Sequence, residues 1–228
     1  MKLLAVDTST VACSVALLLD DIVIDRHEEQ EREHTRLVVP MIEDVLREGQ
    51  CTLSALDALV LGIGPGSFIG LRIATSLVQG LAFGAGLRVA PVSSMLAVAE
   101  EVFTRHEADR VFVAQDAHMN EVYLGQFACD QAVQPVGDER LQAQDRLPEL
   151  AAATDETCFA AGAGWERYPD LWSANESGFS GLAAVRYPSA RFLLPTAQCL
   201  LEAGALLDPA DIEPAYLRHE VAMPPRQS

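Results

Sequence analysis

Residues 58–84 read ALVLGIGPGSFIGLRIATSLVQGLAFG. The apolar run Ala58–Gly62 predicts a strand, the closely spaced glycines after it predict a turn, and a helical pattern extends over residues 68–84. Ser67 is a candidate cap for the start of the helix, and Gly84 or Gly86 is a candidate for its end. The stretch therefore predicts a strand, a glycine turn and a helix in succession.

The glycine turn has two interpretations. Glycines 62, 64 and 66 allow a positive φ and let a phosphate or another backbone approach closely, and the amides that open a helix favour an anion. Pro65 breaks the GxGxxG spacing of dinucleotide-binding turns, and the Gly-Lys-Ser/Thr of a P-loop is absent. A turn that binds phosphate and a turn that only packs the helix tightly onto its sheet both stay open.

The helix over 68–84 is unusually apolar. Arg72 and Gln79 are its only clearly polar long side chains. A row of small residues follows one side: Ser76, Gly80 and Gly84. A helix that covers a single face of a sheet should be polar over half its circumference, so this helix is expected to be buried on two sides. Its second side is covered either within its own domain or by a partner.

Composition limits the function classes. The chain has 228 residues, enough for one large or two small domains, and its net charge of -17 repels phosphate backbones. Any nucleic-acid role would need a basic partner. The five cysteines form no CxxC pair, which is typical of reduced thiols in a cytoplasmic protein. Because Asp7 interrupts the apolar N-terminus, we expect neither a signal sequence nor a membrane span.

The first lobe is predicted to cover residues 1–105. Its first expected elements are strands Lys2–Val6, Val11–Leu19 and Ile22–Arg26, whose alternating pattern predicts an antiparallel meander. A helix Thr35–Glu48, the central strand and helix, a strand Leu87–Pro91, and a helix from Ser93 or Ser94 to Phe103 are expected to follow. Asp7 beside Thr8 could hold a hydrated metal, orient a phosphate or simply cap its turn. His34 is a candidate metal ligand or a surface group.

The second lobe is predicted to cover residues 106–228, with a C-terminal helix that can pack back on the first lobe. Its expected strands are Arg110–Ala114, Glu121–Ala128, Gln131–Val136 and Thr157–Ala161. Its expected helices are Arg146–Thr154, Trp165–Trp172 and Ser189–Gly204, the last kinked at Pro195. The remaining segments are predicted to be a loop, Asn175–Gly181, an extended segment, Glu213–Arg218, and a disordered end, Met223–Ser228. Asp116, His118 and Glu121 cluster at a hairpin tip, either as a metal site or for solvation alone.

These duplicated halves resemble the actin, sugar-kinase and Hsp70 superfamily, in which ATP lies between two lobes. The resemblance implies an α/β fold with two actin-like lobes, each a mixed β-sheet with flanking helices. More closely, the sequence resembles the bacterial TsaB family. The segments that carry this resemblance are VDTST at 6–10, EHTRLVVPMI at 33–42, LGIGPGSFIGLRIA at 61–74, PVSSMLAVA at 91–99, DAHMNEVYLG at 116–125 and EPAYLR at 213–218.

The TsaB resemblance implies a role in making threonylcarbamoyladenosine beside the tRNA anticodon. Family members are non-catalytic partners of the transferase TsaD, and the ATPase TsaE acts on their complex. tRNA is then contacted only through the complex, and the protein forms a homodimer when alone. TsaD-like relatives carry metal-binding histidines where this chain has Ser93, Ser94 and Val98, which are poor ligands for a catalytic metal. We therefore expect neither catalytic nor metal-binding residues.

The resemblance also places two groups of residues. The family pairs through two first-lobe helices, which match residues 35–48 and 68–84. The interface residues expected there are Leu37, Met41, Val45, Arg72, Ser76, Gln79, Gly80 and Phe83. A vestigial nucleotide site would contain Asp7, Thr8, Gly64, Gly66, Asp116, Gly162 and Gly164. No resident cofactor is expected, although binding of ATP or ADP stays open.

Enzymatic functions form the alternatives. One is an ATP-dependent small-molecule kinase, and another is a glycoprotease-like metallopeptidase. The absence of HExxH or any paired histidines argues against the peptidase. No obvious catalytic Asp follows the second-lobe hairpin, which argues against the kinase, but Asp7 and Asp116 keep that alternative open. A third alternative is a regulator that binds nucleotide without turnover.

Overall fold

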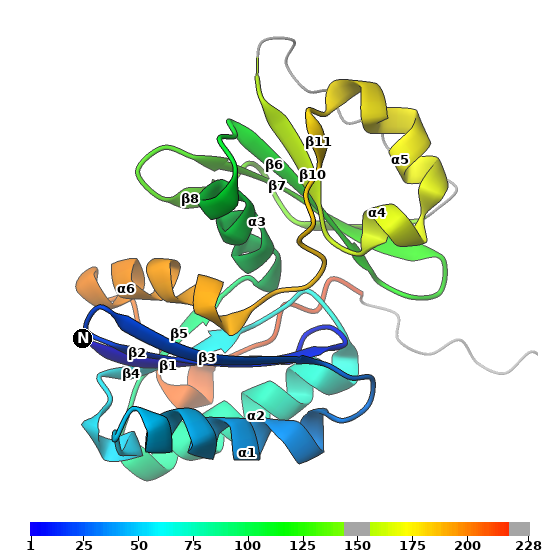
Figure 1. The fold of residues 1–228 in the computed structure, drawn as a ribbon. Coiled ribbons are helices and arrows are strands. Elements are labelled where there is room, and N and C mark those ends of the chain that lie inside the picture. The colour runs from blue at the N-terminus through cyan, green and yellow to red at the C-terminus, as the bar shows by residue number, and fades with distance from the viewer. Residues whose placement is uncertain (144–155, 219–228) are drawn as a thin grey trace, which may run out of the picture.

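A computed structural model describes residues 1–143 and 156–218. They form two mixed β-sheets, one of five strands in the order β3-β2-β1-β4-β5 and one of six strands with β11-β10-β6-β7-β8 as its main path. Each sheet carries helices on its faces (Figure 1). The predicted α/β fold with two mixed sheets and flanking helices is confirmed.

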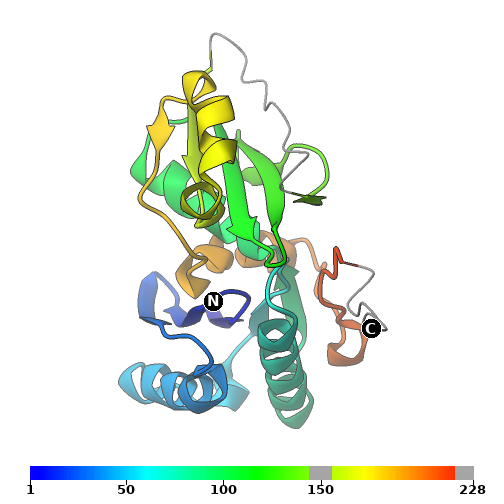
Figure 2. The ribbon, with the colours of Figure 1, turned by 90° about the vertical axis from the view of Figure 1, so that its right-hand side faces the viewer.

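The first sheet is built from residues 2–92. Its strands are β1 (Lys2–Asp7), β2 (Ala12–Leu19), β3 (Ile22–Glu29), β4 (Ala58–Gly62) and β5 (Val89–Val92). The first three strands form the predicted antiparallel meander, and β1, β4 and β5 run parallel. Its helices are α1 (His34–Glu48) and α2 (Phe68–Ala85), with a short 3-10 turn, η1 (Leu53–Ala55), before β4. Both helices lie on one side of the sheet (Figures 1 and 2).

The second sheet is built around one long hairpin. Its strands are β6 (Arg110–Asp116), β7 (Glu121–Cys129), β8 (Val133–Pro135), β9 (Arg140–Ala143), β10 (Cys158–Ala161) and β11 (Gly181–Leu182). The helices on it are α4 (Gly164–Arg167) and α5 (Pro169–Asn175), followed by the 3-10 turn η3 (Glu176–Gly178). The strand β9 was not predicted; it pairs with the first half of β7, whereas β8 pairs with the end of β7.

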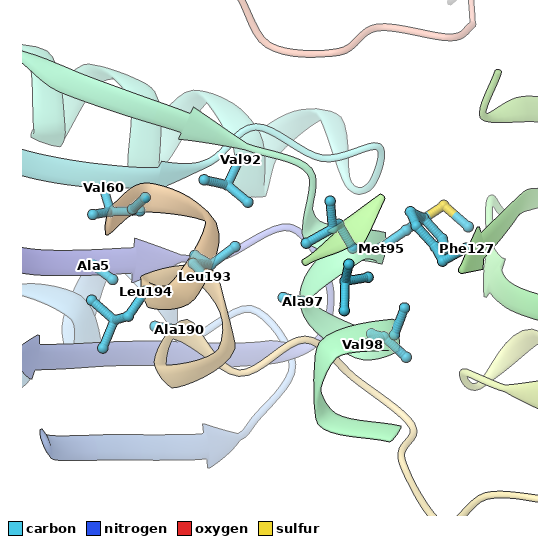
Figure 3. Close-up of a cluster of buried hydrophobic side chains, with 14 of the residues drawn as sticks. Ala5, Val60, Val92, Met95, Ala97, Val98, Phe127, Ala190, Leu193 and Leu194 are labelled. Atoms are coloured by element: carbon cyan, nitrogen blue, oxygen red, sulfur yellow. The ribbon is translucent and has the colours of Figure 1, made fainter. Parts of the chain in front are cut away.

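The two sheets share one apolar core, which surrounds α3 (Ser94–Arg105). Ala5 and Val60 of the first sheet, Val98 of α3 and Phe127 of the second sheet belong to this cluster of buried side chains, together with Leu193 of the C-terminal segment (Figure 3). Burying these apolar side chains between the lobes favours their association.

The C-terminal segment returns to the first sheet, on the face opposite α1 and α2 (Figure 1). On that face it forms η4 (Ala190–Leu193) and α6 (Leu194–Glu202), and it then continues to η5 (Pro209–Asp211), which lies beside α2 (Figure 2). The amide of Ala190 donates a 2.9 Å hydrogen bond to the hydroxyl of Ser14 in β2. The first sheet is therefore covered on both faces, as its parallel strands require.

Several predicted boundaries differ from those observed. The helix predicted from Thr35 begins at His34, and no side chain caps its start. Pro195 does not kink a longer helix, because it lies in the first turn of α6, where the missing amide costs no helical hydrogen bond. The predicted loop Asn175–Gly181 contains η3 and the start of β11. The helix predicted at Arg146–Thr154 and the end Met223–Ser228 lie outside the described residues.

Candidate functional site

Asp7 lies at the centre of a buried hydrogen-bond network at the end of β1. Its Oδ1 accepts from the amide and the hydroxyl of Ser9, at 2.8 and 2.7 Å, and its Oδ2 accepts from the hydroxyl of Ser94 at 2.6 Å. Ser94 Oγ also accepts from the amide of Gly64 at 3.0 Å. Burial raises the pKa of Asp7, and the hydroxyl and amide donors partly oppose that rise. The carboxylate therefore joins β1, the glycine turn and α3.

The glycine turn packs tightly against the loop that follows β1. A Cβ atom at Gly62 would lie 1.9 Å from Asp7 Oδ2, and one at Gly66 would lie 2.1 Å from the carbonyl oxygen of Ser9. The Ser67 amide donates to that same carbonyl at 2.6 Å. Ser67 also caps α2, as predicted, by accepting from the Gly70 amide. These contacts explain why glycine is needed here without a bound phosphate.

The three positions that hold histidines in TsaD-like relatives have structural roles in this chain. Ser93 caps α3 by accepting from the amides of the second and third residues after it, and its hydroxyl also donates to Glu139. Ser94 belongs to the Asp7 network, and the side chain of Val98 is fully buried between the lobes. Each of the three side chains therefore takes part in the packing or hydrogen bonding of α3.

A cleft of about 840 Å³ opens between the lobes, within the usual size range for small-molecule sites. Its first-lobe wall includes Ser9, Thr10, His34, Gly66, Ser67, Ile69 and Ile73. Its second-lobe wall includes Gln115, Asp116, His118, Ala163, Glu166, Arg167, Arg186 and Tyr187. Of the seven residues expected in a vestigial nucleotide site, only Gly66 and Asp116 line the cleft. Asp7 and Thr8 are buried beside it.

The second-lobe glycines are needed for close packing. A Cβ atom at Gly162, where φ is +101°, would lie 2.2 Å from the carbonyl oxygen of Ala114, and one at Gly164 would lie 2.8 Å from the Ala114 carbonyl carbon. The Gly162 amide donates to Val185 O at 2.8 Å. Gly162 and Gly164 therefore let α4 approach β6, and the Gly162 amide already has a partner within the chain.

The hairpin tip after β6 is held by the protein itself. Asp116 Oδ1 accepts from the His118 amide at 2.8 Å and from the Tyr168 hydroxyl at 2.7 Å. Glu121, the third member of the predicted polar cluster, is paired with Arg218. Over residues 1–143 and 156–218, no group of three or more His, Cys, Asp or Glu side chains is placed to hold a metal ion.

The exposed side of α2 is apolar. Ile69 is 70% exposed and Phe83 is 86% exposed, and Ser76 and Gly80 lie exposed between them along the helix. A Cβ atom at Gly80 would meet nothing within 4 Å. The opposite side of α2, including Ala74 and Val78, packs into the first-lobe core. The helix therefore has one face buried in its own lobe and a second apolar face in solvent.

Other residues expected at the interface are engaged within the chain. Met41 and Val45 are buried and Leu37 is half-buried, all three packing in the first-lobe core. Gln79 donates through Nε2 to the carbonyl oxygen of Pro209 at 2.9 Å. The guanidinium of Arg72 lies 3.9 Å from the centre of the Phe68 ring. These residues have partners within the chain because α1 and α2 both pack against the first sheet.

Arg72 also reaches the C-terminal segment, where its Nε donates to the Tyr216 hydroxyl at 3.4 Å. The Tyr216 ring packs on Phe68 with centroids 5.4 Å apart. Sequence reasoning missed this cover of α2, because no local pattern links an extended tail to a helix 144 positions earlier. The expected interface also omitted Ile69. Ile69, Ile73 and Leu77 are spaced four residues apart and form an apolar row along the helix, and this row could have indicated that Ile69 belongs to the exposed apolar face.

By length and composition alone, α2 could cross a membrane, and it is the only helix in the described part of the chain that passes this test. About a third of its residues are buried within the protein. Core helices of soluble proteins pass the same test, so the finding is weak support for a membrane span.

Comparison with known proteins identifies close relatives. Residues 19–223 match the family model of TsaD, described as tRNA N6-adenosine threonylcarbamoyltransferase. The chain is 38% identical to the tRNA threonylcarbamoyladenosine biosynthesis protein TsaB of Haemophilus influenzae, with 97% of this chain and 95% of the relative covered. It is 36% identical to the Escherichia coli protein of the same name, with 97% and 96% covered.

A solved structure gives the same result for the fold. YeaZ from Pseudomonas aeruginosa superimposes with a TM-score of 0.85 at 36% sequence identity, covering 95% of this chain and 99% of that one. The agreement over nearly the whole length confirms the resemblance inferred from the sequence segments, including the actin-like arrangement of the two lobes.

Proposed function

This chain belongs to the TsaB family, and on that premise we propose that it acts in threonylcarbamoyladenosine biosynthesis as a non-catalytic partner of TsaD. In this role it positions and activates the transferase that modifies tRNA adenosine next to the anticodon. The proposal places the protein in the cytoplasm, where TsaE acts on the assembled complex, and makes it a homodimer when alone.

The observation that carries this proposal is the exposed face of α2. Its apolar side chains and its small residues fit a second helix, because Gly80 allows a close backbone approach while Ile69 and Phe83 supply apolar area. A first-lobe helix of TsaD is the proposed occupant in the complex, and the same face of a second copy is the occupant in the homodimer.

Two further observations support a non-catalytic role. The positions of the family's metal ligands hold Ser93, Ser94 and Val98, each of which has a structural role in α3. The net charge of -17 disfavours direct binding of tRNA, so we propose that tRNA is held through the partners.

The test is size-exclusion chromatography with light scattering, on the chain alone and mixed with purified TsaD. The wild type is expected to form a one-to-one complex, and Gly80→Arg is expected to remove it, since the guanidinium would occupy the space of the partner helix. Leu182→Arg is the matched control, because Leu182 is 41% exposed on the second lobe and should leave pairing intact. Circular dichroism confirms that each variant is folded. Pairing retained by Gly80→Arg would refute the interface.

The cleft supports a second candidate, a nucleotide-sensing role without turnover. Its volume of about 840 Å³ suits a nucleotide, and Arg32, Arg167 and Arg186 line it in an otherwise acidic protein. Calorimetry with ATP and ADP tests this role. Saturable binding without hydrolysis would support it, and the absence of binding would remove it. Hydrolysis of ATP by the chain alone would instead favour the kinase alternative over a non-catalytic partner.

A further inference from the structure

The C-terminal strap, defined here as residues 206–218, runs from the first lobe to the second. Its early part is fixed to the first lobe: Val89 and Leu207 exchange two backbone hydrogen bonds of 3.0 and 2.9 Å, and the Arg88 guanidinium donates to Leu206 O at 3.2 Å. The side chain of Ile212 is buried in the first-lobe core. These contacts anchor the strap along β5 and α2.

The strap then follows the glycine turn to the start of α2. The Ala215 amide donates to Ile63 O at 2.9 Å, and Tyr216 packs on Phe68. Ile63 directly follows β4, and Phe68 is the first residue of α2. The strap therefore reaches the glycine turn, of which Gly66 and Ser67 line the cleft.

Arg218 crosses from there to the second lobe. Its Nη2 donates to Ala117 O at 2.8 Å and to His118 O at 3.4 Å, and it forms an ion pair with Glu121. Its Nη1 lies 3.1 Å from the sulfur of Met119. The side chains of Arg218 and Glu121 are only 20% and 30% exposed, so water screens their attraction less than on an open surface. Arg218 thus contacts four residues of the hairpin: the backbone oxygens of Ala117 and His118, the sulfur of Met119 and the carboxylate of Glu121.

The hairpin tip needs such support. His118, Met119 and Asn120 all have positive φ values, of 58°, 55° and 62°. A run of three non-glycine residues in the left-handed region is costly and persists only when neighbouring structure holds it. Asp116 and His118 of the same hairpin line the cleft. The position of the tip consequently sets the second-lobe wall of the cleft.

From these contacts we propose that Arg218 is an interlobe clasp that fixes the opening of the cleft. In this arrangement the two lobes hinge at the shared core around α3. At the opposite side of the cleft, the strap joins the glycine turn of the first lobe to the hairpin tip of the second. This proposal goes beyond pairing with TsaD and does not depend on it, since every contact lies within one chain. Loss of Arg218 releases the second-lobe wall while leaving the first-lobe anchor of the strap in place.

The test measures the distance between lobes by double electron–electron resonance on the isolated full chain. Spin labels are placed at Glu43→Cys on α1 and Ser173→Cys on α5, both exposed and away from the exposed face of α2 and the core around α3, after Cys51, Cys129 and Cys199 are replaced by serine. The labelled chain is diluted in unlabelled parent, so that only distances within one chain are measured. The parent should give one narrow distance distribution. Arg218→Ala should give a broader one with a longer mean distance, and an unchanged distribution would overturn the proposal.

Two variants keep the test interpretable. Glu121→Gln removes the ion pair but keeps the carbonyl contacts, so it should broaden the distribution less than Arg218→Ala. Arg191→Ala is the matched control, because it removes an arginine–aspartate pair of the same C-terminal segment, with Asp25, that lies away from the hairpin. It should leave the distribution unchanged, and a broadening equal to that of Arg218→Ala would also contradict the clasp.

Hydrogen exchange supplies a second readout. In Arg218→Ala, amides of residues 116–121 should exchange about tenfold faster, the change expected when a hydrogen-bonded charged contact is lost. Amides of α1 and α2 should keep their protection, which shows that the first lobe stays folded. Equal protection of residues 116–121 in Arg218→Ala and the parent would argue against the clasp.

Discussion

The Ser94 hydroxyl donates a 2.6 Å hydrogen bond to the buried carboxylate of Asp7, which lies 87 positions earlier in the chain. This contact joins the start of α3 to the end of β1. It occupies, with a structural role, a position where the catalytic relatives carry a metal-binding histidine. The ends of β1 and α3 and the glycine turn are therefore joined by one buried hydrogen-bond network.

Ser94→Ala should destabilise the protein by about 1–3 kcal/mol, because it removes the hydroxyl that donates to Asp7 Oδ2 and accepts from the Gly64 amide, both of which are buried. Urea unfolding followed by circular dichroism measures the change. Ser76→Ala, at an exposed position of α2, is the control and should stay within about 0.5 kcal/mol of the wild type. Equal stabilities of the two variants would contradict the network.

Two glycines of α2 should respond in opposite directions to alanine. A Cβ atom at Gly70 would lie 2.0 Å from Thr8 O, whereas one at Gly80 would meet nothing within 4 Å. Gly70→Ala should cost about 2 kcal/mol or more, since the backbone of the β1 loop must move. Gly80→Ala should stabilise the isolated chain by about 0.5–1 kcal/mol, because alanine is the better helix former. Thermal unfolding of both variants and the wild type, at a protein concentration that excludes dimers, measures the two changes in stability.

Glu139 should make stability depend on pH near neutrality. Burial raises the pKa of Glu139 from 4.5 to about 7, although a hydrogen bond from Ser93 opposes the rise. Between these two values the folded chain holds a proton that the unfolded chain has released. The free energy of unfolding should therefore fall as the pH rises from 4.5 to 7 and then level off. Denaturant titrations of the wild type and Glu139→Gln across this range test it, and identical pH slopes would count against it.

Restoring histidines should not restore a metal site. In a triple variant with Ser93→His, Ser94→His and Val98→His, the last two side chains would have to enter a buried network and the interlobe core. The expected result is loss of stability by more than about 2 kcal/mol without stoichiometric zinc binding, since overpacking is costly and no ligand geometry is available. Calorimetry with Zn²⁺ on folded protein checks this outcome, and tight one-to-one binding would contradict it.

Much of the fold could be predicted because it rests on local patterns. The alternation of apolar residues predicted the β1–β3 meander. Ser67, Ser93 or Ser94, and Gly84 or Gly86 were recognised as candidate caps because their chemistry acts within one turn of their own helices, and the structure selects Ser93 and Gly86. The boundary errors have the same origin. Pro195 is compatible with a helix start or a kink, and only the preceding 3-10 turn places it at the start.

The candidate site was less accessible from sequence. Met41 and Val45 share an apolar pattern with an interface helix, but a pattern does not state whether the covering surface is the protein's own sheet or a partner. Gln79 has the same limitation, since its carbonyl partner at Pro209 is 130 positions away. The spacing of residues along the sequence does not show which distant group a side chain will contact.

The sequence by itself determined the order of strands and helices in the first lobe, the need for glycine in the turn before α2, and the excess of apolar surface on that helix. Only the tertiary structure decided which part of that surface stays in solvent, why Ser94 and Val98 are not ligand positions, and that Arg218 joins the two lobes. The physical reason is the separation along the chain over which each kind of interaction acts. Propensities and caps act over a few residues, whereas burial and hydrogen-bond partners depend on segments that meet only after the chain has folded.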